Sequence, residues 1–148
     1  YSDSDWAGCK ASRRSTSGGL VTLGGSVLRS WSNRQSTIAL SSGEAEFHSA
    51  SKAAAELMAV SSMMSDLGWP VERRLFVDAS AAQAMSNRQG IGKLRHLEVK
   101  FLWLQDLAKA GVLAVRKISG QRNPADVLTK PMGFADMLAK LALVHVAA

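Results

Sequence analysis

The sequence predicts one α/β domain in which helices flank a mixed β-sheet. Three observations predict it: an antiparallel meander in the first third, a long helix without Gly or Pro, and short strands that alternate with helices in the second half. A chain of 148 residues with 47% hydrophobic and 20% charged residues suits a single folded domain over residues 1–148. No apolar run reaches the ~18 residues of a membrane span, so we expect no membrane association.

The first third has the signals of three antiparallel strands. Residues 1–6 alternate in character as a strand does, with Asp3 and Asp5 on one face. Two further apolar runs flank Gly24-Gly25, and a Gly-Gly pair between such runs is a strong hairpin signal. The pattern therefore predicts a three-stranded meander.

A long helix is predicted over residues 45–67. Ser41 and Glu44 have the spacing of a capping box, and Gly68 marks the end of the helix. Steps of four and three trace one apolar stripe through Ala50, Ala53, Leu57, Val60, Met64 and Leu67, and this stripe begins at Glu46.

The second half alternates strands with helices. The pattern predicts a strand over 74–78, a short helix over 79–87, a helix over 94–108, a strand over 112–118, and a last helical segment that Asn123-Pro124 opens. The order of elements is therefore βββ-α-β-α-α-β-α.

Charge favours a polyanionic partner. Eighteen Lys and Arg against twelve Asp and Glu give a net charge of +6, which suits nucleic acid and equally fits a domain that is basic for solubility. The single Cys9 excludes an internal disulfide, and with three scattered His it makes no zinc-site pattern.

Four acidic residues suggest a metal site. Glu46 lies on the apolar stripe, where an unpaired carboxylate is costly, and the first strand offers it Asp3 and Asp5 rather than a cation. Asp78 ends a strand and Asp126 starts the last helix; singly, these two also fit an N-cap and a helix-dipole role. Together the acids indicate hard oxygen ligands for Mg²⁺ or Mn²⁺.

Several motifs resemble one family. The segments are YSDSDWAGC at 1–9, RRSTSGG at 13–19, WSNRQSTIALSSGEAEF at 31–47, LFVDASAA at 75–82, KLRHLEV at 93–99 and NPADVLTKP at 123–131. In this order and spacing the chain resembles the ribonuclease H domain of copia-like retrotransposon polyproteins, within the type 1 ribonuclease H family. The resemblance implies the ribonuclease H fold, with a five-stranded mixed sheet in the order 3-2-1-4-5 flanked by helices.

The resemblance also implies a reaction. It is endonucleolytic hydrolysis of the RNA strand of RNA–DNA hybrids with two Mg²⁺ ions, for which Mn²⁺ substitutes, leaving 5′-phosphate and 3′-hydroxyl ends. Asp3, Glu46, Asp78 and Asp126 match the four carboxylates that serve as metal ligands and catalytic residues, with Asp5 as second choice for the first.

Candidate substrate contacts come from polar loops. Arg13, Arg14, Ser15, Thr16 and Ser17 suit phosphate or 2′-hydroxyl groups, whereas Gln35, Ser36 and Thr37 suit the DNA strand. His96 matches a family histidine that reaches the site or the hybrid. All of these also fit ordinary solvated or helix residues. The loop at 117–122 lacks the histidine of cellular type 1 enzymes, which implies slower turnover.

The expected partners are an RNA–DNA hybrid and a covalently linked reverse transcriptase domain. We expect the free domain to be monomeric and intracellular, in the cytoplasm or a virus-like particle. Two alternatives stay open: a catalytically weak or inactive nucleic-acid-binding module of the same fold, and a metal nuclease that acts on DNA.

Overall fold

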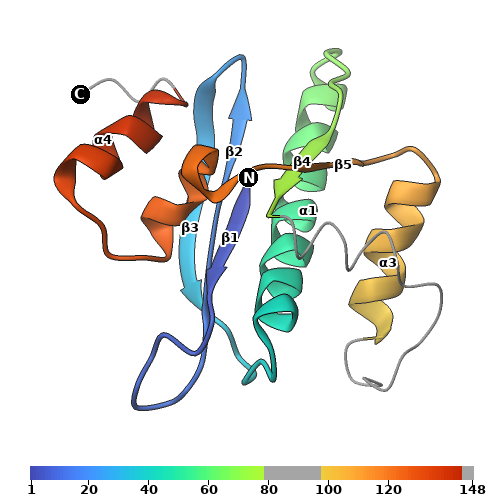
Figure 1. Cartoon of the computed structure of the whole chain (residues 1–148). Coiled ribbons are helices and arrows are strands. Elements are labelled where there is room, and N and C mark those ends of the chain that lie inside the picture. The colour runs from blue at the N-terminus through green and yellow to red at the C-terminus, as the bar shows by residue number, and fades with distance from the viewer. Residues whose placement is uncertain (79–97, 145–148) are drawn as a thin grey trace.

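The computed structural model describes residues 1–78 and 98–144, a mixed α/β arrangement (Figure 1). Its elements are β1 (Ser2–Asp5), β2 (Thr16–Leu23), β3 (Ser26–Arg34), α1 (Ser42–Asp66), β4 (Arg74–Val77), α3 (Glu98–Lys109), β5 (Ala114–Lys117), the short 3₁₀ helices η2 (Gly120–Arg122) and η3 (Pro124–Leu128), and α4 (Phe134–Ala142). The α/β class is confirmed. The predicted helix over 79–87 and His96 lie outside the described residues.

The predicted meander is confirmed. Strand β1 pairs antiparallel with β2, which places Asp3 opposite Gly18, and β2 pairs antiparallel with β3. Gly24 and Gly25 turn the hairpin with φ of 59° and 90°, a region that favours glycine. The Gly-Gly signal therefore marks the turn correctly.

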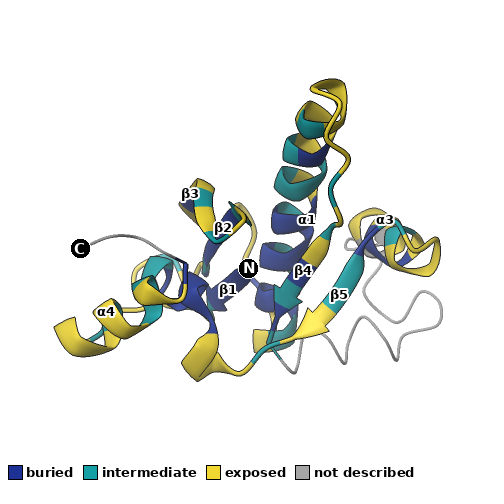
Figure 2. Cartoon of the chain, turned by 90° about the horizontal axis from the view of Figure 1, so that it is seen from above, coloured by how far each residue is buried: buried dark blue, intermediate teal, exposed yellow. Residues whose placement is uncertain are grey.

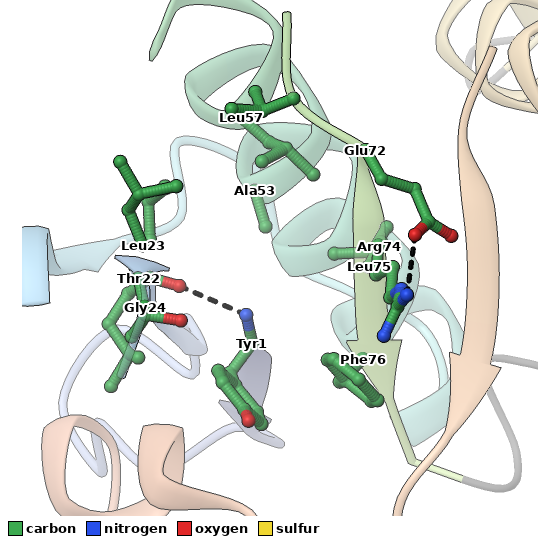
Figure 3. Close-up of a pocket in the computed structure, with 13 residues that line it drawn as sticks. Tyr1, Thr22, Leu23, Gly24, Ala53, Leu57, Glu72, Arg74, Leu75 and Phe76 are labelled. Carbon is green, nitrogen blue, oxygen red and sulfur yellow. Dashed lines mark hydrogen bonds and ion pairs between the residues drawn. The ribbon is translucent and has the colours of Figure 1, made fainter. Parts of the chain in front are cut away.

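The strands form two hydrogen-bonded groups. The first has the order β1-β2-β3 and the second is the parallel pair β4-β5, so the expected single sheet with the order 3-2-1-4-5 is not shown. Among the described residues, β1 and β4 lie next to each other without ladder pairing. The Tyr1 ring stacks on Phe76 at 4.9 Å between centroids. Beside this stack, a cavity of about 350 Å³ separates the end of β2 from β4 (Figure 3).

Helix α1 begins and ends as its sequence signals indicate. Ser41 Oγ accepts a hydrogen bond from Glu44 N at 3.1 Å, whereas Glu44 Oε2 reaches back to Leu40 N at 2.8 Å. Gly68, with φ of 81°, follows the helix. Of the predicted stripe, Ala50 and Ala53 are buried, whereas Leu67, the residue directly after the helix, is 70% exposed.

The layers place the helices on two sides of the strands. Helices α1 and α3 lie on one side of the strands and α4 lies on the other (Figure 2), and η3 contacts β1, β2 and α4. The buried core between α1 and the strands includes Trp31, Phe47, Leu75 and Leu104. No helix in the described ranges is long and apolar enough to cross a bilayer.

A glycine lets η3 approach the sheet. A Cβ on Gly18 would lie 2.6 Å from Thr129 Cγ2 and 2.8 Å from Leu128 Cβ, closer than such atoms can come. The buried Asn123 fastens the same helix, because its Nδ2 donates to Ser2 O at 2.9 Å and its Oδ1 caps Ala125 N at 3.1 Å. The predicted Asn cap is thus confirmed, and η3 is held against β1 and β2.

Candidate active site

Asp3 lies in the middle of β1 with its side chain toward η3. It is 3% exposed, and its carboxylate accepts hydrogen bonds from Thr129 Oγ1 and, at 3.0 Å, from Lys130 Nζ. Burial, with the charge of Asp126 and against the lowering effects of Thr129 and Lys130, raises the pKa of Asp3 to about 6. The carboxylate is therefore held in an environment that disfavours its charge.

Glu46 lies near the start of α1, and its side chain reaches Ser4 on β1. Its Oε1 accepts hydrogen bonds from Ser4 N at 3.1 Å and Ser4 Oγ at 3.0 Å, whereas its Oε2 is buried and has no hydrogen-bond partner among the residues that the structure describes. Burial, together with the charges of Asp3 and Asp78 and against the hydrogen bonds of Ser4, raises the pKa of Glu46 to about 8. The predicted anomaly, an acid on the buried face of the helix, is present.

Asp78 directly follows β4 and is partly exposed. Its carboxylate is close enough to Glu46 for its negative charge to raise the pKa of that group. The end of β4 thus brings a third acid toward the carboxylates on β1 and α1.

Asp126 is the fourth acid and comes from η3. Its Oδ1 lies 3.3 Å from Lys130 Nζ, and its Oδ2 lies 2.9 Å from Lys140 Nζ. Burial acts to raise the pKa of Asp126, but the hydrogen bonds with Lys140 and Asp3 and the charges of both lysines outweigh it, and the pKa lies below its ordinary value. Lys130 therefore bridges Asp3 and Asp126.

The four acids form a continuous set in which each acts electrostatically on another. Their carboxylate oxygens are the donors that Mg²⁺ and Mn²⁺ prefer, and the partnerless Oε2 of Glu46 is a ligand position without a proton donor. In the described part of the chain, however, no three His, Cys, Asp or Glu side chains are arranged to chelate one ion. The chemistry of the donors fits a divalent ion, and Lys130 lies between two of them.

Two neighbouring acids have structural contacts that separate them from this set. Asp5 Oδ1 accepts from Thr16 N across the β1–β2 connection, and Glu44 serves the start of α1. Asp5 and Glu44 therefore have structural partners, and the choice of Asp3 and Glu46 as the site residues stays a prediction.

The predicted substrate residues fall into two groups. Arg13 and Arg14 are exposed, and so are Ser36 and Thr37. The others are involved in packing: Ser15 Oγ accepts from Ala7 N, Gln35 Nε2 donates to Ser17 Oγ and Ala45 O, and Thr16 N donates to Asp5. Gln35, Ser17, Ser36 and Thr37 still line one cavity of about 220 Å³ together with Asn33, Arg34, His48, Lys52 and Lys100.

Sequence reasoning did not find four residues of the site: Ser4, Thr129, Lys130 and Lys140. A partial signal exists for Lys130, which stands four positions after Asp126 in the spacing of a helical ion pair. Lys140 carries no such signal, because α4 brings it back to Asp126 across 14 residues.

The chain is similar in sequence to polyproteins of retrotransposons. The retrovirus-related Pol polyprotein from transposon TNT 1-94 of Nicotiana tabacum is 33% identical over 149 aligned positions, which cover 98% of this chain and 11% of that polyprotein. The retrovirus-related Pol polyprotein from transposon RE1 of Arabidopsis thaliana is 28% identical over 152 positions, which cover 99% of this chain and 10% of that polyprotein.

A shorter similarity is to the secreted RxLR effector protein 161 of Plasmopara viticola, which is 52% identical over 56 residues, 38% of this chain and 39% of that protein. No protein-family model matches the sequence, and no solved structure matches the chain.

The relatives that span nearly the whole chain support a domain derived from a retrotransposon. The chain spans about a tenth of the length of these curated relatives, which fits one domain within a larger Pol polyprotein.

Proposed function

We propose that this domain is a metal-dependent ribonuclease H, which hydrolyses the RNA strand of RNA–DNA hybrids and leaves 5′-phosphate and 3′-hydroxyl ends. One observation carries the proposal. Three buried acids, Asp3, Glu46 and Asp126, and the partly exposed Asp78 come from four places in the fold and are linked by their charges, in a chain similar along its length to Pol polyproteins. The resemblance of the motifs to copia-like ribonuclease H domains supports this reaction over other metal-dependent ones.

Asp3, Glu46, Asp78 and Asp126 would hold the two Mg²⁺ ions. When bound, such ions lower the pKa of an attacking water and stabilise the leaving oxygen of the phosphodiester. The chain's own residues position the ligands. Ser4 orients Glu46 through two hydrogen bonds, and Asn123 fastens η3, which carries Asp126, to the backbone of β1.

The hybrid would be bound through its two backbones. The exposed Arg13 and Arg14 and the polar cavity near Lys52 offer cations and hydroxyl groups for phosphates, as the net charge of +6 favours. The proposal includes a covalently linked reverse transcriptase as partner, as in a Pol polyprotein. It also includes the closure of both strand groups into one sheet in the order 3-2-1-4-5.

The test is cleavage of a hybrid with a labelled RNA strand in Mg²⁺, Mn²⁺ or EDTA. Wild type is compared with Asp78→Asn and with Asp66→Asn, a matched change of an exposed aspartate at the end of α1. We expect metal-dependent nicking of the RNA strand only, a loss of at least about 100-fold in Asp78→Asn, and no change in Asp66→Asn. Nicking that survives Asp78→Asn would contradict the assignment of the site.

A second candidate is a nucleic-acid-binding module of the same fold with weak or no catalysis. The specific observation in its favour is Lys130, which occupies the space between two of the acids. Duplex DNA, double-stranded RNA and single strands in parallel binding and cleavage assays separate the two. Hybrid binding without cleavage at millimolar Mn²⁺ would favour the module, and cleavage of duplex DNA would favour a DNA nuclease.

A further inference from the structure

Lys130 bridges Asp3 and Asp126, an acidic pair whose members come from opposite ends of the chain. Its Nζ lies 3.0 Å from Asp3 Oδ1 and 3.3 Å from Asp126 Oδ1. At these distances one ammonium group supplies hydrogen bonds and positive charge to both carboxylates. This is the electrostatic role that a bound divalent cation would have at the same oxygens.

Lys130 lies on the solvent side of Asp3 and Asp126. The Lys130 side chain is 46% exposed, whereas the side chains of Asp3 and Asp126 are 4% and 11% exposed. Lys130 and Asp126 also line an open cavity of about 580 Å³ between η3 and α4. A lysine side chain has a flexible four-carbon stem, so the ammonium group has room to leave the carboxylates for water.

Lys140 contacts the same cluster in a different way. Its side chain is 12% exposed, and its Nζ donates to Asp126 Oδ2 and to the carbonyl oxygens of Gly120 and Asn123. These contacts fix Lys140 as part of the packing between η2, η3 and α4. Of these two lysines, Lys130 is therefore the one that an incoming ion can displace.

We propose that the Lys130 ammonium group is a built-in competitor of the divalent ion, which holds Asp3 and Asp126 together in the ion-free domain and leaves them when the ion binds. The inference rests on the proposed metal-dependent function. It assigns to Lys130 the control of metal affinity, separately from the ligands themselves.

Two measurements on the full 148-residue chain test this. In the first, Mn²⁺ binding is followed by electron paramagnetic resonance of free Mn²⁺ for wild type, Lys130→Met, Lys130→Arg and Lys109→Met. Lys109 is an exposed lysine at the end of α3, so its variant is the control for net charge. We expect Lys130→Met to bind Mn²⁺ on the order of tenfold more tightly, and the other variants to stay close to wild type.

The second measurement follows the lysine ammonium groups of the wild type by ¹H–¹⁵N NMR, with the Lys130 signal assigned from its absence in Lys130→Arg. Because it is hydrogen-bonded to two carboxylates, the group should give a signal without metal. We expect this signal to be lost or strongly shifted as Mg²⁺ is added.

The outcomes separate the inference from the function. An unchanged Lys130 signal while backbone signals of Glu46 and Asp126 respond to Mg²⁺ overturns the competition and leaves the metal site standing. Equal Mn²⁺ affinity in Lys130→Met and Lys109→Met does the same. Absence of Mn²⁺ binding in all four proteins overturns both the competition and the metal-dependent function.

Discussion

Glu46 and Asp126 are buried to nearly the same extent, yet their carboxyl groups have opposite properties. They are 6% and 8% exposed, but the pKa of Glu46 is raised to about 8 while that of Asp126 is lowered. Burial acts in the same direction on both. The difference is that Asp126 has two lysines as partners, whereas Glu46 has the hydrogen bonds of Ser4 and acids for neighbours.

This contrast divides the candidate site into an α1 half, which contains Glu46 and Ser4, and an η3 half, which contains Asp126 and its partners Lys130 and Lys140. In the η3 half the chain supplies its own cations, and in the α1 half the charge of the acid is opposed by every acid near it. The α1 half is therefore where an external cation has most to contribute. Stability can be measured without substrate, so three variants test the contrast directly.

The largest expected effect is on the pH dependence of stability. Below pH 4.5 Glu46 is protonated in both the folded and the unfolded chain, and between about 4.5 and 8 the folded chain holds its proton more tightly. The stability that Glu46 contributes is therefore lost as the pH rises through about 8. In EDTA we expect Glu46→Gln to gain stability over wild type between pH 5 and 9, on the order of 3 kcal/mol.

The measurement is urea unfolding of both proteins at each pH. Comparing the two cancels the other titrating groups, including the buried Tyr1 amino group, whose pKa burial lowers to about 5. A difference that stays constant from pH 5 to pH 9 would show that Glu46 is not the strained group.

The next effect should disturb the η3 half alone. In Gly18→Ala the new methyl group meets Leu128 and Thr129, so η3 must move away from β2. We expect a loss of about 2 kcal/mol in the free energy of unfolding, as for other overpacked sites. Gly43→Ala, where the nearest atom is Ser41 Oγ at 4.0 Å, is the control and should not destabilise. Equal urea midpoints for the two variants would contradict the close packing of η3.

The smallest effect should come from Ser4→Ala in the α1 half. It removes the hydroxyl donor to Glu46 Oε1 and leaves the backbone donor in place, so we expect a loss of about 1 kcal/mol. The loss should be larger at pH 9 than at pH 5, because the hydrogen bond is stronger to a charged carboxylate. Ser51→Ala, which removes a buried hydroxyl without a partner, is the matched control in the same unfolding experiment. A loss that does not change with pH would separate Ser4 from the charge of Glu46.

Local sequence signals predicted the parts of the fold that depend on neighbours in the chain. The Gly24-Gly25 turn, the Ser41 cap and the Asn123 cap are set by a few consecutive residues, and all are present. The anomaly of Glu46 was also visible, because helical spacing alone puts it on a buried face. The metal and substrate roles of the predicted residues stay predictions.

The remaining features depend on contacts that sequence spacing does not encode. Thr129 and Lys130 meet Asp3 across 126 and 127 positions, and Ser17 and Gln35 turned inward to bond each other across 18. A polar loop pattern does not distinguish a side chain that binds a ligand from one that satisfies a buried neighbour. Periodicity likewise extended the helical stripe to Leu67, although the helix ends at Asp66 and Leu67 is exposed.

The hydrogen bond from Asn123 to the backbone of Ser2 has a consequence for folding. It joins positions 121 residues apart, and the contacts of Asp3 with η3 are as distant in sequence. Contacts of such separation require closure of almost the whole chain, a step that slows folding. The hydrogen bonds between Ser4 and Glu46 need only the first third of the chain, whereas the contacts of Asp3 with Thr129 and Lys130 need both ends. The two parts of the candidate site therefore differ in the length of chain that must close to form them.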